Sequence, residues 1–351
     1  MSNTRALTLL TKDRDSFSMS TSSNEAFRAY LEPHRRAITA HCYRMLGSLQ
    51  DAEEVTQESL LRGWQRLDEL RESAAAKAWL YRIATNACLD RLKHRRRRRR
   101  VQPHLVVPQA DPERPLGPPD HEHLWIEPAP DALFEPADDD RKRPDARASL
   151  RESISLAFIT ALQLLPPKQR AALLLVDVLG WRPTETAELL KTSETSVYSL
   201  LQRARKNLDS APSKAPWPSD RDEEEALRRY IAMWDTGNID AFTAMLAHDA
   251  VVSMPPQVTW YAGTAAIRRF FERVLEWARA TSSEYRFVKL RANGAPALAV
   301  YARSAENTEY RVVGITVLCM RAGLVTQVTR FAMPYLYLRF GLPERMSGDG
   351  P

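Results

Sequence analysis

The spacing of apolar residues predicts two helical stretches in the first two-thirds of the chain. Within residues 23–100, apolar side chains recur three or four positions apart, as at Leu80, Ile83 and Ala87, which is the spacing of one helix face. A second stretch, residues 148–210, has the same periodicity. We therefore expect two all-α modules, each with its own core.

The pattern changes at residue 221. The segment DEEEALRRYIAMW predicts a helix, because acidic residues in the first turn complement the helix dipole. Later apolar runs predict strands, and Asn293-Gly294 and Ala322-Gly323 are candidate turns. These runs are ALAVYA (297–302), YRVVGITVLCM (310–320) and LVTQVTRFAM (324–333). Residues 221–340 are thus predicted to form an α+β domain.

Proline and acidic residues mark the segments between these units. Residues 101–147 contain ten prolines, and eleven acidic residues against five basic ones. We predict an extended acidic linker, either a solvated spacer or an electrostatic mimic of nucleic acid. Its island LWIEPAPDALF (124–134) is apolar enough to dock on a surface, which this sequence pattern does not identify. Residues 1–22 are predicted to be disordered, 211–220 to be a second linker and 341–351 to be a tail.

Composition and charge argue against several classes of protein and are compatible with others. The 351 residues have a formal net charge of +6 and a pI of about 9.2, which permits a polyanionic partner. Cys42, Cys88 and Cys319 lie far apart without CxxC spacing, so neither a disulfide framework nor a metal site is predicted. No run approaches the about 20 apolar residues of a membrane span, and the N-terminus lacks a signal-peptide pattern. We expect a cytoplasmic protein with no cofactor and no membrane partner.

Positive charge is concentrated at the end of the first helical stretch. Residues Lys93–Arg100 read KHRRRRRR, and a run with seven positive charges neutralises phosphates. In the preceding amphipathic segment (79–92), Arg82 and Asn86 lie near one side, and asparagine can hydrogen-bond a base edge. Tyr81 is predicted either to pack in the core or to stack on an unpaired base. The pattern predicts nucleic-acid binding; a solvated tail or a membrane-surface patch is the alternative.

An acidic stripe precedes the basic segment. In DAEEVTQESLLRGW (51–64), Asp51, Glu54 and Glu58 recur at helical spacing on one face. A solvated helix surface is the usual role of such a stripe, and a docking face for a partner is the alternative.

Residues 161–208 have the pattern of a helix-turn-helix. Pro183 fits the first position of a short helix, and residues 191–193 fit a turn. The second helix would bury four regularly spaced side chains, Val197, Leu201, Ala204 and Leu208. Its polar residues would be free to face a major groove: Tyr198, Ser199, Gln202, Arg203, Arg205 and Lys206. A helical hairpin with a basic surface is the alternative.

These motifs resemble a known family. DAEEVTQESLLRGW and WLYRIATNACLDRLKHRRRR are similar to the second conserved region of sigma-70 factors of the extracytoplasmic-function (ECF) group. LPPKQRAALLLVDVLGW, together with the helix-turn-helix, is similar to the fourth region. The resemblance identifies residues 23–100 as region 2 and residues 148–210 as region 4. It implies an alternative sigma factor that binds core RNA polymerase and promoter DNA and directs transcription initiation.

The resemblance implies roles for single residues of region 2. The acidic helix would dock on the clamp helices of the largest polymerase subunit, through Asp51, Glu54, Gln57 and Glu58. The next helix and the loop RESAAAK (71–77) would hold a flipped base of the −10 element, which Asn86 would read. The other −10 contacts would be Arg82, Lys93, Arg95 and Arg96.

Region 4 would lie on the polymerase flap and read the −35 element. The residues implied are Tyr198, Ser199, Gln202 and Arg203. The sequence departs from the usual family pattern at Arg182, where the helix cap is commonly Ser or Thr, and at Tyr198 and Leu200, where Lys or Arg is common. Because the two promoter elements lie more than one turn of DNA apart, we expect the two modules to sit far apart.

Residues 221–340 resemble SnoaL-like domains of the nuclear transport factor 2-like superfamily, through RRYIAMWDTGNIDAFTAMLAHDAVVSMPP and WYAGTAAIRRFF. The resemblance implies a cone-shaped domain around a pocket for an unknown small-molecule ligand. Some members are enzymes that use Asp and His, for which Asp235, His248 and Asp249 are the candidates; a turn and a helix end are their structural alternatives. We expect no enzyme activity. Related sigma factors with such a tail imply that the domain modulates sigma activity in cis.

A second interpretation is a helix-turn-helix regulator fused to a SnoaL-like small-molecule enzyme. It uses the recognition helix and the pocket, but it leaves the motifs between residues 51 and 100 unexplained.

Overall fold

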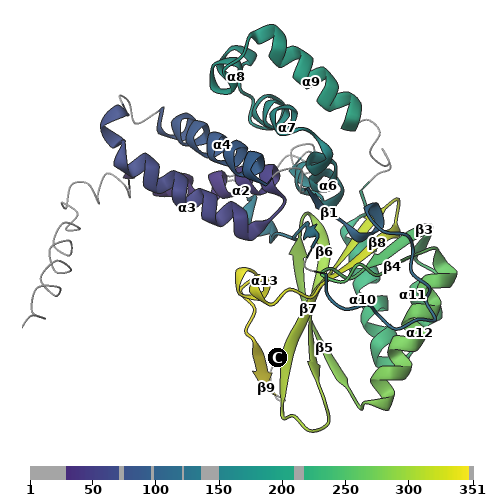
Figure 1. Ribbon diagram of the computed structural model, residues 1–351. Helices are drawn as coiled ribbons and strands as arrows, with labels where there is room; N and C mark the ends of the chain where they lie inside the picture. The colour runs from purple at the N-terminus through teal and green to yellow at the C-terminus, as the bar shows by residue number, and fades with distance from the viewer. Residues whose placement is uncertain are drawn as a thin grey trace, which may run out of the picture.

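The protein folds into two helical modules that lie above an α+β domain in Figure 1. The computed structural model describes residues 29–70, 75–95, 99–120, 122–135, 150–208 and 217–347. The predicted fold class, two all-α modules followed by an α+β domain, is confirmed. Residues 1–22, which we expected to be disordered, lie outside the described residues.

The first helical module is built from three long helices within its described residues. Its elements are η1 (Glu32–His34), α2 (Arg35–Leu46), α3 (Leu49–Gln65), η2 (Leu67–Glu69) and α4 (Ala76–His94). Helix α2 ends at Gly47, whose φ of +67° is left-handed, and a Cβ there would lie 2.9 Å from the Gln163 side chain. Leu80 and Ala84 are fully buried, as their periodicity predicts.

The second helical module contains the predicted helix-turn-helix. Its described helices are α6 (Leu156–Leu164), α7 (Pro167–Leu173), the π-helical turn η7 (Leu174–Val178), α8 (Pro183–Leu190) and α9 (Glu194–Leu208). The Glu185 carboxylate accepts a hydrogen bond from the backbone N–H of Arg182 at 2.9 Å, which caps α8 without a Ser or Thr. Lys191, with a φ of +50°, forms the turn. Three of the four predicted seam residues are buried, Val197, Leu201 and Ala204.

The described part of the linker packs on its neighbours. Its elements are β1 (Arg100–Val101), η4 (Pro103–Leu105), β2 (Leu124–Trp125) and η5 (Asp131–Leu133), and β1 pairs with β2 in parallel. Trp125 and Ile126 are buried, so the apolar island is docked, as its composition predicts. The segment therefore differs from the expected free spacer, because apolar burial and hydrogen bonds such as Asp120 N–H to Pro256 O (2.9 Å) anchor it.

The C-terminal domain has a curved sheet with helices packed against it, and the last helix lies across the sheet from the others (Figure 1). Its helices are α10 (Asp220–Thr236), α11 (Ile239–Thr243), α12 (Thr264–Ala280) and α13 (Pro334–Arg339). Its strands are β3 (Leu246–Ser253), β4 (Trp260–Ala262), β5 (Glu284–Ala292), β6 (Ala295–Arg303), β7 (Glu309–Arg321), β8 (Leu324–Phe331) and β9 (Arg345–Ser347). The sheet order is β4-β3-β8-β7-β6-β5, with β9 paired to β7. Asn293-Gly294 and Ala322-Gly323 form the predicted turns, all four residues with positive φ.

Both faces of strand β6 are buried, but in different hydrophobic cores. Leu298 packs in the core that the sheet forms with α10 and α12. Ala297, Ala299 and Tyr301 point to the other face and join the core that contains the helical modules. A strand covered on both sides has a continuous apolar run, which explains why ALAVYA lacks alternating polar residues. The C-terminal domain and the helical modules are therefore joined by a shared core.

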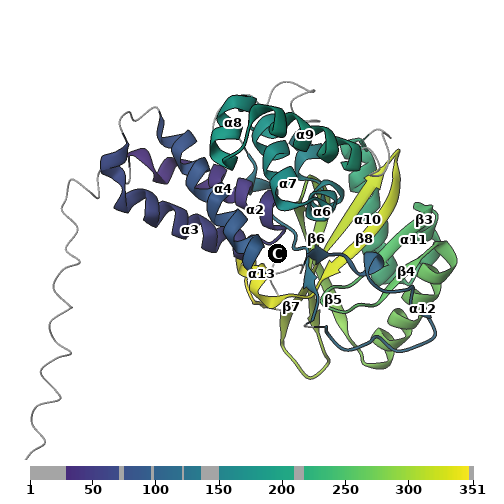
Figure 2. The same cartoon turned by 45° about the horizontal axis from the view of Figure 1, so that its top comes forward.

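The two helical modules lie side by side, with α4 next to α7 (Figure 2). Arg170 of α7 is 3 % exposed and donates hydrogen bonds to the carbonyls of Met45, Gln163 and Leu165. Burial lowers the pKa of Arg170 to about 9. The expectation that the modules sit far apart does not describe this conformation, because apolar burial and the hydrogen bonds of Arg170 hold the modules together here.

Candidate polymerase-binding and nucleic-acid-binding surfaces

The exposed side of α3 carries three of the four residues implied in polymerase docking. Glu54, Gln57 and Glu58 are exposed. Glu58 pairs with Arg62 at 2.6 Å, and Glu54 pairs with the guanidinium of Arg91. Such surface pairs contribute little to stability, so these carboxylates remain available to a partner.

Asp51 does not share that exposed face. It is 5 % exposed, and its carboxylate accepts ion pairs from Arg91 (3.0 Å), Arg95 (2.5 Å) and Arg100 (2.7 Å). Burial alone would raise the pKa of Asp51, but the Arg95 and Arg100 guanidinium groups outweigh it and hold the pKa below its usual value. In this structure Asp51 is a structural anchor for the arginine run.

Glu127 of the linker caps the N-terminus of α3. Its carboxylate accepts hydrogen bonds from the Leu49 N–H and the Ser48 hydroxyl, both at 2.8 Å, and it also pairs with Arg100 at 3.2 Å. Glu127 is 2 % exposed. A carboxylate at a helix N-terminus complements the dipole and satisfies N–H groups that lack partners in the helix. The sequence pattern does not predict this role for Glu127; its signal is an acid inside the apolar island.

The residues implied in −10 binding lie in different surroundings. Asn86 and Lys93 are exposed on α4. The Arg82 guanidinium instead donates a hydrogen bond to Glu188 of α8 at 3.0 Å, which links the two modules. Arg95 is held by Asp51, and Arg96 and residues 71–74 of the expected base-binding loop lie outside the described residues.

Tyr81 belongs to the core between the two modules. It is 4 % exposed, and its ring lies edge-on to Trp181 of the second module with centroids 6.4 Å apart. Of the two roles left open, packing is the one that this conformation shows.

Helix α9 presents the residues implied in −35 binding to solvent. Tyr198 is 56 % exposed, and its hydroxyl donates to Glu194 at 3.3 Å. Ser199, Gln202 and Arg203 are exposed beside it. The buried seam on the opposite side holds the helix, so these side chains form one outward face that a major groove can accept.

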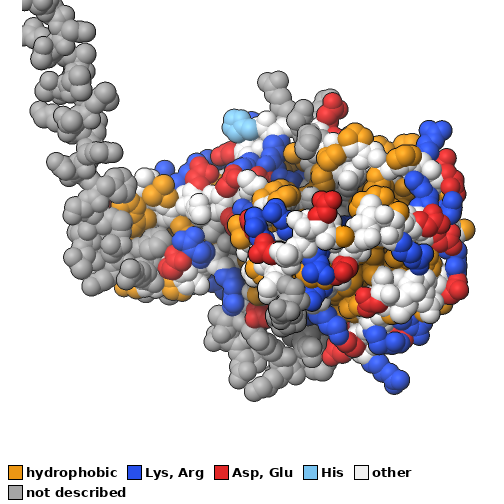
Figure 3. All heavy atoms as spheres, turned by 90° about the horizontal axis from the view of Figure 1, so that it is seen from below, with side chains coloured by type: hydrophobic (Ala, Val, Ile, Leu, Met, Phe, Trp, Pro, Cys, Tyr) orange, Lys and Arg blue, Asp and Glu red, His pale blue; other side chains and the backbone are white. Residues whose placement is uncertain are grey.

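The face of the molecule farthest from the helical modules has mixed charge. Figure 3 shows basic and acidic side chains interspersed with hydrophobic patches across the described part of this face. The potentials of interspersed opposite charges largely cancel at a distance. The described part of this face therefore lacks the concentrated positive charge that favours nucleic-acid binding.

One turn of the C-terminal domain is inserted between the two modules and the linker. Asn293, 1 % exposed, donates to the Tyr43 hydroxyl (3.0 Å) and the Ile154 carbonyl (2.6 Å), and accepts from the Ala129 N–H (2.8 Å). Beside it, the Gly294 carbonyl accepts from Arg151 at 2.7 Å. One side chain thus joins region 2, the linker and the start of region 4 to the sheet.

The C-terminal domain encloses a cavity of about 530 Å³ between the sheet, α10 and α12. Asp235, His248 and Asp249 do not line it. His248 and Asp249 lie exposed on strand β3, not at the end of a helix, and Asp235 is exposed near the end of α10. No catalytic arrangement of these three residues is present in this conformation.

The other expectations from the sequence concern metal sites, membrane-spanning helices and the cysteines. Within the described ranges no group of His, Cys, Asp or Glu side chains is arranged to hold a metal ion. Over the same ranges, no helix combines the length and the hydrophobicity required to cross a membrane. Cys42 and Cys88 come into contact inside the first module, where burial and the neighbouring Cys42 thiol raise the pKa of Cys88.

Comparisons with known proteins agree with this architecture. Residues 30–98 match Sigma-70 region 2, residues 155–208 match Sigma-70, region 4, and residues 227–328 match a SnoaL-like domain. ECF RNA polymerase sigma factor SigG of Mycobacterium tuberculosis (strain ATCC 25618 / H37Rv) is 40 % identical over 324 residues, which cover 91 % of this chain and 85 % of SigG. ECF RNA polymerase sigma factor SigJ of the same strain is 28 % identical over 218 residues, 62 % of this chain and 61 % of SigJ.

A solved structure has the same domain arrangement. The crystal structure of the Mycobacterium tuberculosis sigma factor SigJ superposes with a TM-score of 0.57 at 21 % identity, covering 92 % of this chain and 100 % of that one. At this identity the likeness concerns the fold. Together with the extent of the match to SigG and the order of the three matched regions, it leads to one conclusion: the chain belongs to the ECF family of RNA polymerase sigma factors, in a form with a C-terminal SnoaL-like domain.

Proposed function

We propose that this sigma factor exists in a closed form, defined here as the described packing of region 2, region 4 and the C-terminal domain, and that it opens to initiate transcription. Sigma factors bind core RNA polymerase and promoter DNA. In the closed form the two DNA-reading modules are packed together, whereas the −10 and −35 elements lie more than one turn of DNA apart. The C-terminal domain therefore modulates sigma activity in cis by stabilising the closed form.

The junction at Asn293 is the observation that supports this proposal most strongly. Its three hydrogen bonds to Tyr43, Ala129 and Ile154 reach three different segments from one buried turn. A buried polar group that loses its partners is costly, so these bonds favour keeping the segments together. The ion pair of Arg82 with Glu188 adds a contact between the expected −10 face and region 4.

Within this proposal, single residues have separate roles. Glu54, Gln57 and Glu58 dock on the clamp helices of the largest polymerase subunit, while region 4 lies on the flap. Asn86 reads a −10 base, with Lys93 and, after opening, Arg82 on the phosphates. Residues of α9 read the −35 element. Within the arginine run, Arg95 and Arg100 bind Asp51 in the closed form.

The proposal also covers the location of the protein and a ligand of its C-terminal domain. Because its partner is RNA polymerase, we place the protein in the cytoplasm and assign it no catalytic activity. A small molecule in the cavity of the C-terminal domain would act as an effector by binding the closed and open forms with different affinity.

The test uses one variant of the full chain and a matched control. Asn293→Gly keeps the positive φ of the turn but removes the side-chain hydrogen bonds. We expect a larger radius of gyration in small-angle scattering and core-polymerase affinity raised by about a hundredfold, since three lost bonds of about 1 kcal/mol each shift the equilibrium toward the open form. Ala322→Gly makes the same backbone change in the exposed β7–β8 turn and should behave as the unmodified protein. Identical behaviour of the two variants would refute the closed-form mechanism.

A further inference from the structure

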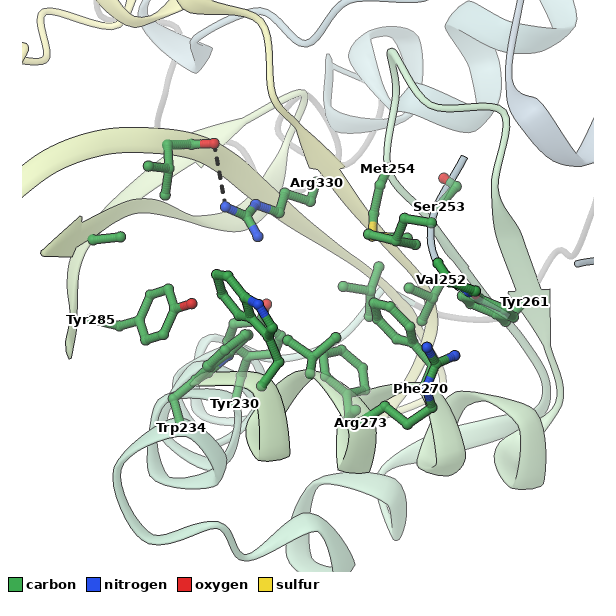
Figure 4. Close-up of a pocket in the computed structure, with 18 of the residues that line it drawn as sticks. Tyr230, Trp234, Val252, Ser253, Met254, Tyr261, Phe270, Arg273, Tyr285 and Arg330 are labelled. Carbon is green, nitrogen blue, oxygen red and sulfur yellow. Dashed lines mark hydrogen bonds between the residues drawn. The ribbon is translucent and has the colours of Figure 1, made fainter. Parts of the chain in front are cut away.

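The cavity of the C-terminal domain has a wall composed largely of aromatic rings. Tyr230 and Trp234 of α10, Phe270 and Phe271 of α12, and Tyr285 of β5 line it. Figure 4 shows Tyr230, Trp234 and Tyr285 on one side of the space and the strand residues Val252 and Met254 on the other. A volume of about 530 Å³ with an apolar wall is in the range of pockets for small organic ligands.

A single cationic group from the sheet reaches this space. The Arg330 side chain of β8 extends into the cavity toward Tyr285 and Tyr230 (Figure 4). One of its terminal nitrogens donates to the Val313 carbonyl at 3.3 Å, while the Nε atom is buried without a hydrogen-bond partner. Among the described residues no carboxylate lies within ion-pair distance of Arg330, and no described lining residue is acidic. A guanidinium in an apolar wall without a counter-charge is costly unless an anion binds to it.

The cavity also has a border that does not belong to the C-terminal domain. Arg114, Pro115 and Leu116 of the linker line it, and we call residues 112–117 the lid segment. Arg273 of α12, itself a lining residue, donates to the carbonyls of Pro112 and Arg114, the second at 2.7 Å.

Side-chain and strand contacts fix the lid segment further. Arg269 forms a two-pronged ion pair with Glu113, at 2.6 and 3.0 Å. Upstream of the lid segment, Trp260 donates its ring N–H to the Val107 carbonyl at 2.9 Å. The part of the chain that connects region 2 to region 4 is thus attached at the mouth of the cavity.

We propose that this cavity binds a flat, ring-containing organic acid, whose anionic group pairs with Arg330 and whose rings stack on the aromatic wall beneath the lid segment. Because the lid segment supplies part of the wall, the bound acid stabilises its docked position. The inference deepens the effector role given under the proposed function, but the assignment of ligand class needs only the cavity itself.

The first experiment measures binding to the full chain. The probes are 1-anilinonaphthalene-8-sulfonate, an aromatic anion, and N-phenyl-1-naphthylamine, its neutral counterpart. Arg330→Gln should weaken binding of the anion by about tenfold and leave the neutral probe within about twofold, because only the charge-assisted contact is lost. Arg330→Lys should restore most of the anion affinity. Arg345→Gln, on β9 outside the lining residues, is the surface control. Equal loss for both probes, or no loss for either, overturns the anion site.

A second measurement does not depend on any variant folding. 2-Naphthoate and 2-naphthamide have the same rings and differ in charge, and each is titrated against the bound anionic probe. The acid should compete at about tenfold lower concentration than the amide, because only the carboxylate of the acid can form a charge-assisted contact with Arg330. Equal potency overturns the assignment to organic acids.

The lid segment is tested by hydrogen exchange of the same protein with and without the anionic probe. Slower exchange in residues 107–117 on binding supports the lid, since the bound molecule contacts it. Unchanged or faster exchange overturns the lid role. Neither readout involves polymerase, so a failure here is separate from a failure of the closed-form mechanism, which the Asn293→Gly variant tests.

Discussion

At Asp51 three guanidinium groups converge on one buried carboxylate. The arginines come from the end of α4 and from the run that follows it, so the carboxylate holds Arg91, Arg95 and Arg100 together. The pKa of Asp51 is lowered below its usual value despite burial. A carboxylate with a lowered pKa in the folded state adds stability above its unfolded pKa, and that stability is lost as the pH falls through the folded pKa.

Asp51→Asn should therefore lower the free energy of unfolding by about 3 kcal/mol at pH 7, because three arginines lose their common partner. The difference from the unmodified protein should narrow as the pH falls below about 4, where the aspartate of the unfolded chain begins to bind protons, and should be lost as the pH falls through the lowered pKa of folded Asp51. Urea unfolding at several pH values measures both effects. Glu54→Gln is the control, with a cost under about 1 kcal/mol expected for an exposed pair. A pH-independent difference would contradict the ion-pair explanation.

At the scale of the element, two arginines of α9 that look equivalent in the sequence have different surroundings. Arg203 is exposed, whereas Arg205 is bound by Asp177 of η7, with contacts of 2.7 and 3.0 Å. The Asp177 side-chain hydrogen bond raises the pKa of Arg205. Unlike the single-contact pairs of Glu54 and Glu58, this pair is two-pronged, and while it persists the guanidinium is directed at Asp177 and not at a base edge.

We expect Arg203→Gln to change base preference at one position of the −35 element, by about 1–3 kcal/mol of discrimination. Arg205→Gln should leave preference unchanged. Binding of the full chain to a library of −35 duplexes at fixed salt distinguishes the two, since affinity without stated salt is not comparable. If both variants lower affinity for every duplex alike, α9 contacts only phosphates.

At the scale of the whole molecule, α13 connects the C-terminal domain to the proposed docking helix. Leu336 and Tyr337 are buried in the core that the sheet shares with the helical modules. Arg339 reaches out and pairs with Glu53 of α3 at 2.7 Å, and the Tyr335 hydroxyl donates to Glu127 at 3.2 Å. The apolar C-terminal segment thus packs in the shared core and also contacts region 2 and the linker.

A charge exchange tests this contact. Arg339→Glu places two acids together and should shift the closed form toward opening by about two- to fivefold, the range of a partly exposed pair. The double variant Arg339→Glu with Glu53→Arg should restore the closed population, because the pair is remade with reversed charges. Energy transfer between dyes on region 2 and the C-terminal domain reports the opening. Additive effects of the two substitutions would show that the pair does not join the domains.

The local sequence pattern was sufficient to predict the helices, the strands and the outward face of the recognition helix α9. The turns at Asn293-Gly294 and Ala322-Gly323 follow from the preference of these residues for positive φ, which needs no distant partner. The seam of α9 follows from helical spacing alone. The family resemblance named the two sigma regions and the SnoaL-like domain, and the comparisons confirm all three.

The exposure and the partners of charged residues were decided only by the tertiary structure. Asp51 and Glu54 belong to one acidic stripe in the sequence, yet one is buried among arginines and the other exposed. Glu127 caps α3 from a segment that reads as a linker, and Asn293, predicted only as a turn, joins three distant segments. The physical reason is range: helix period and turn geometry are set by neighbours within a few residues, whereas burial of a charge depends on which remote segments the fold brings against it.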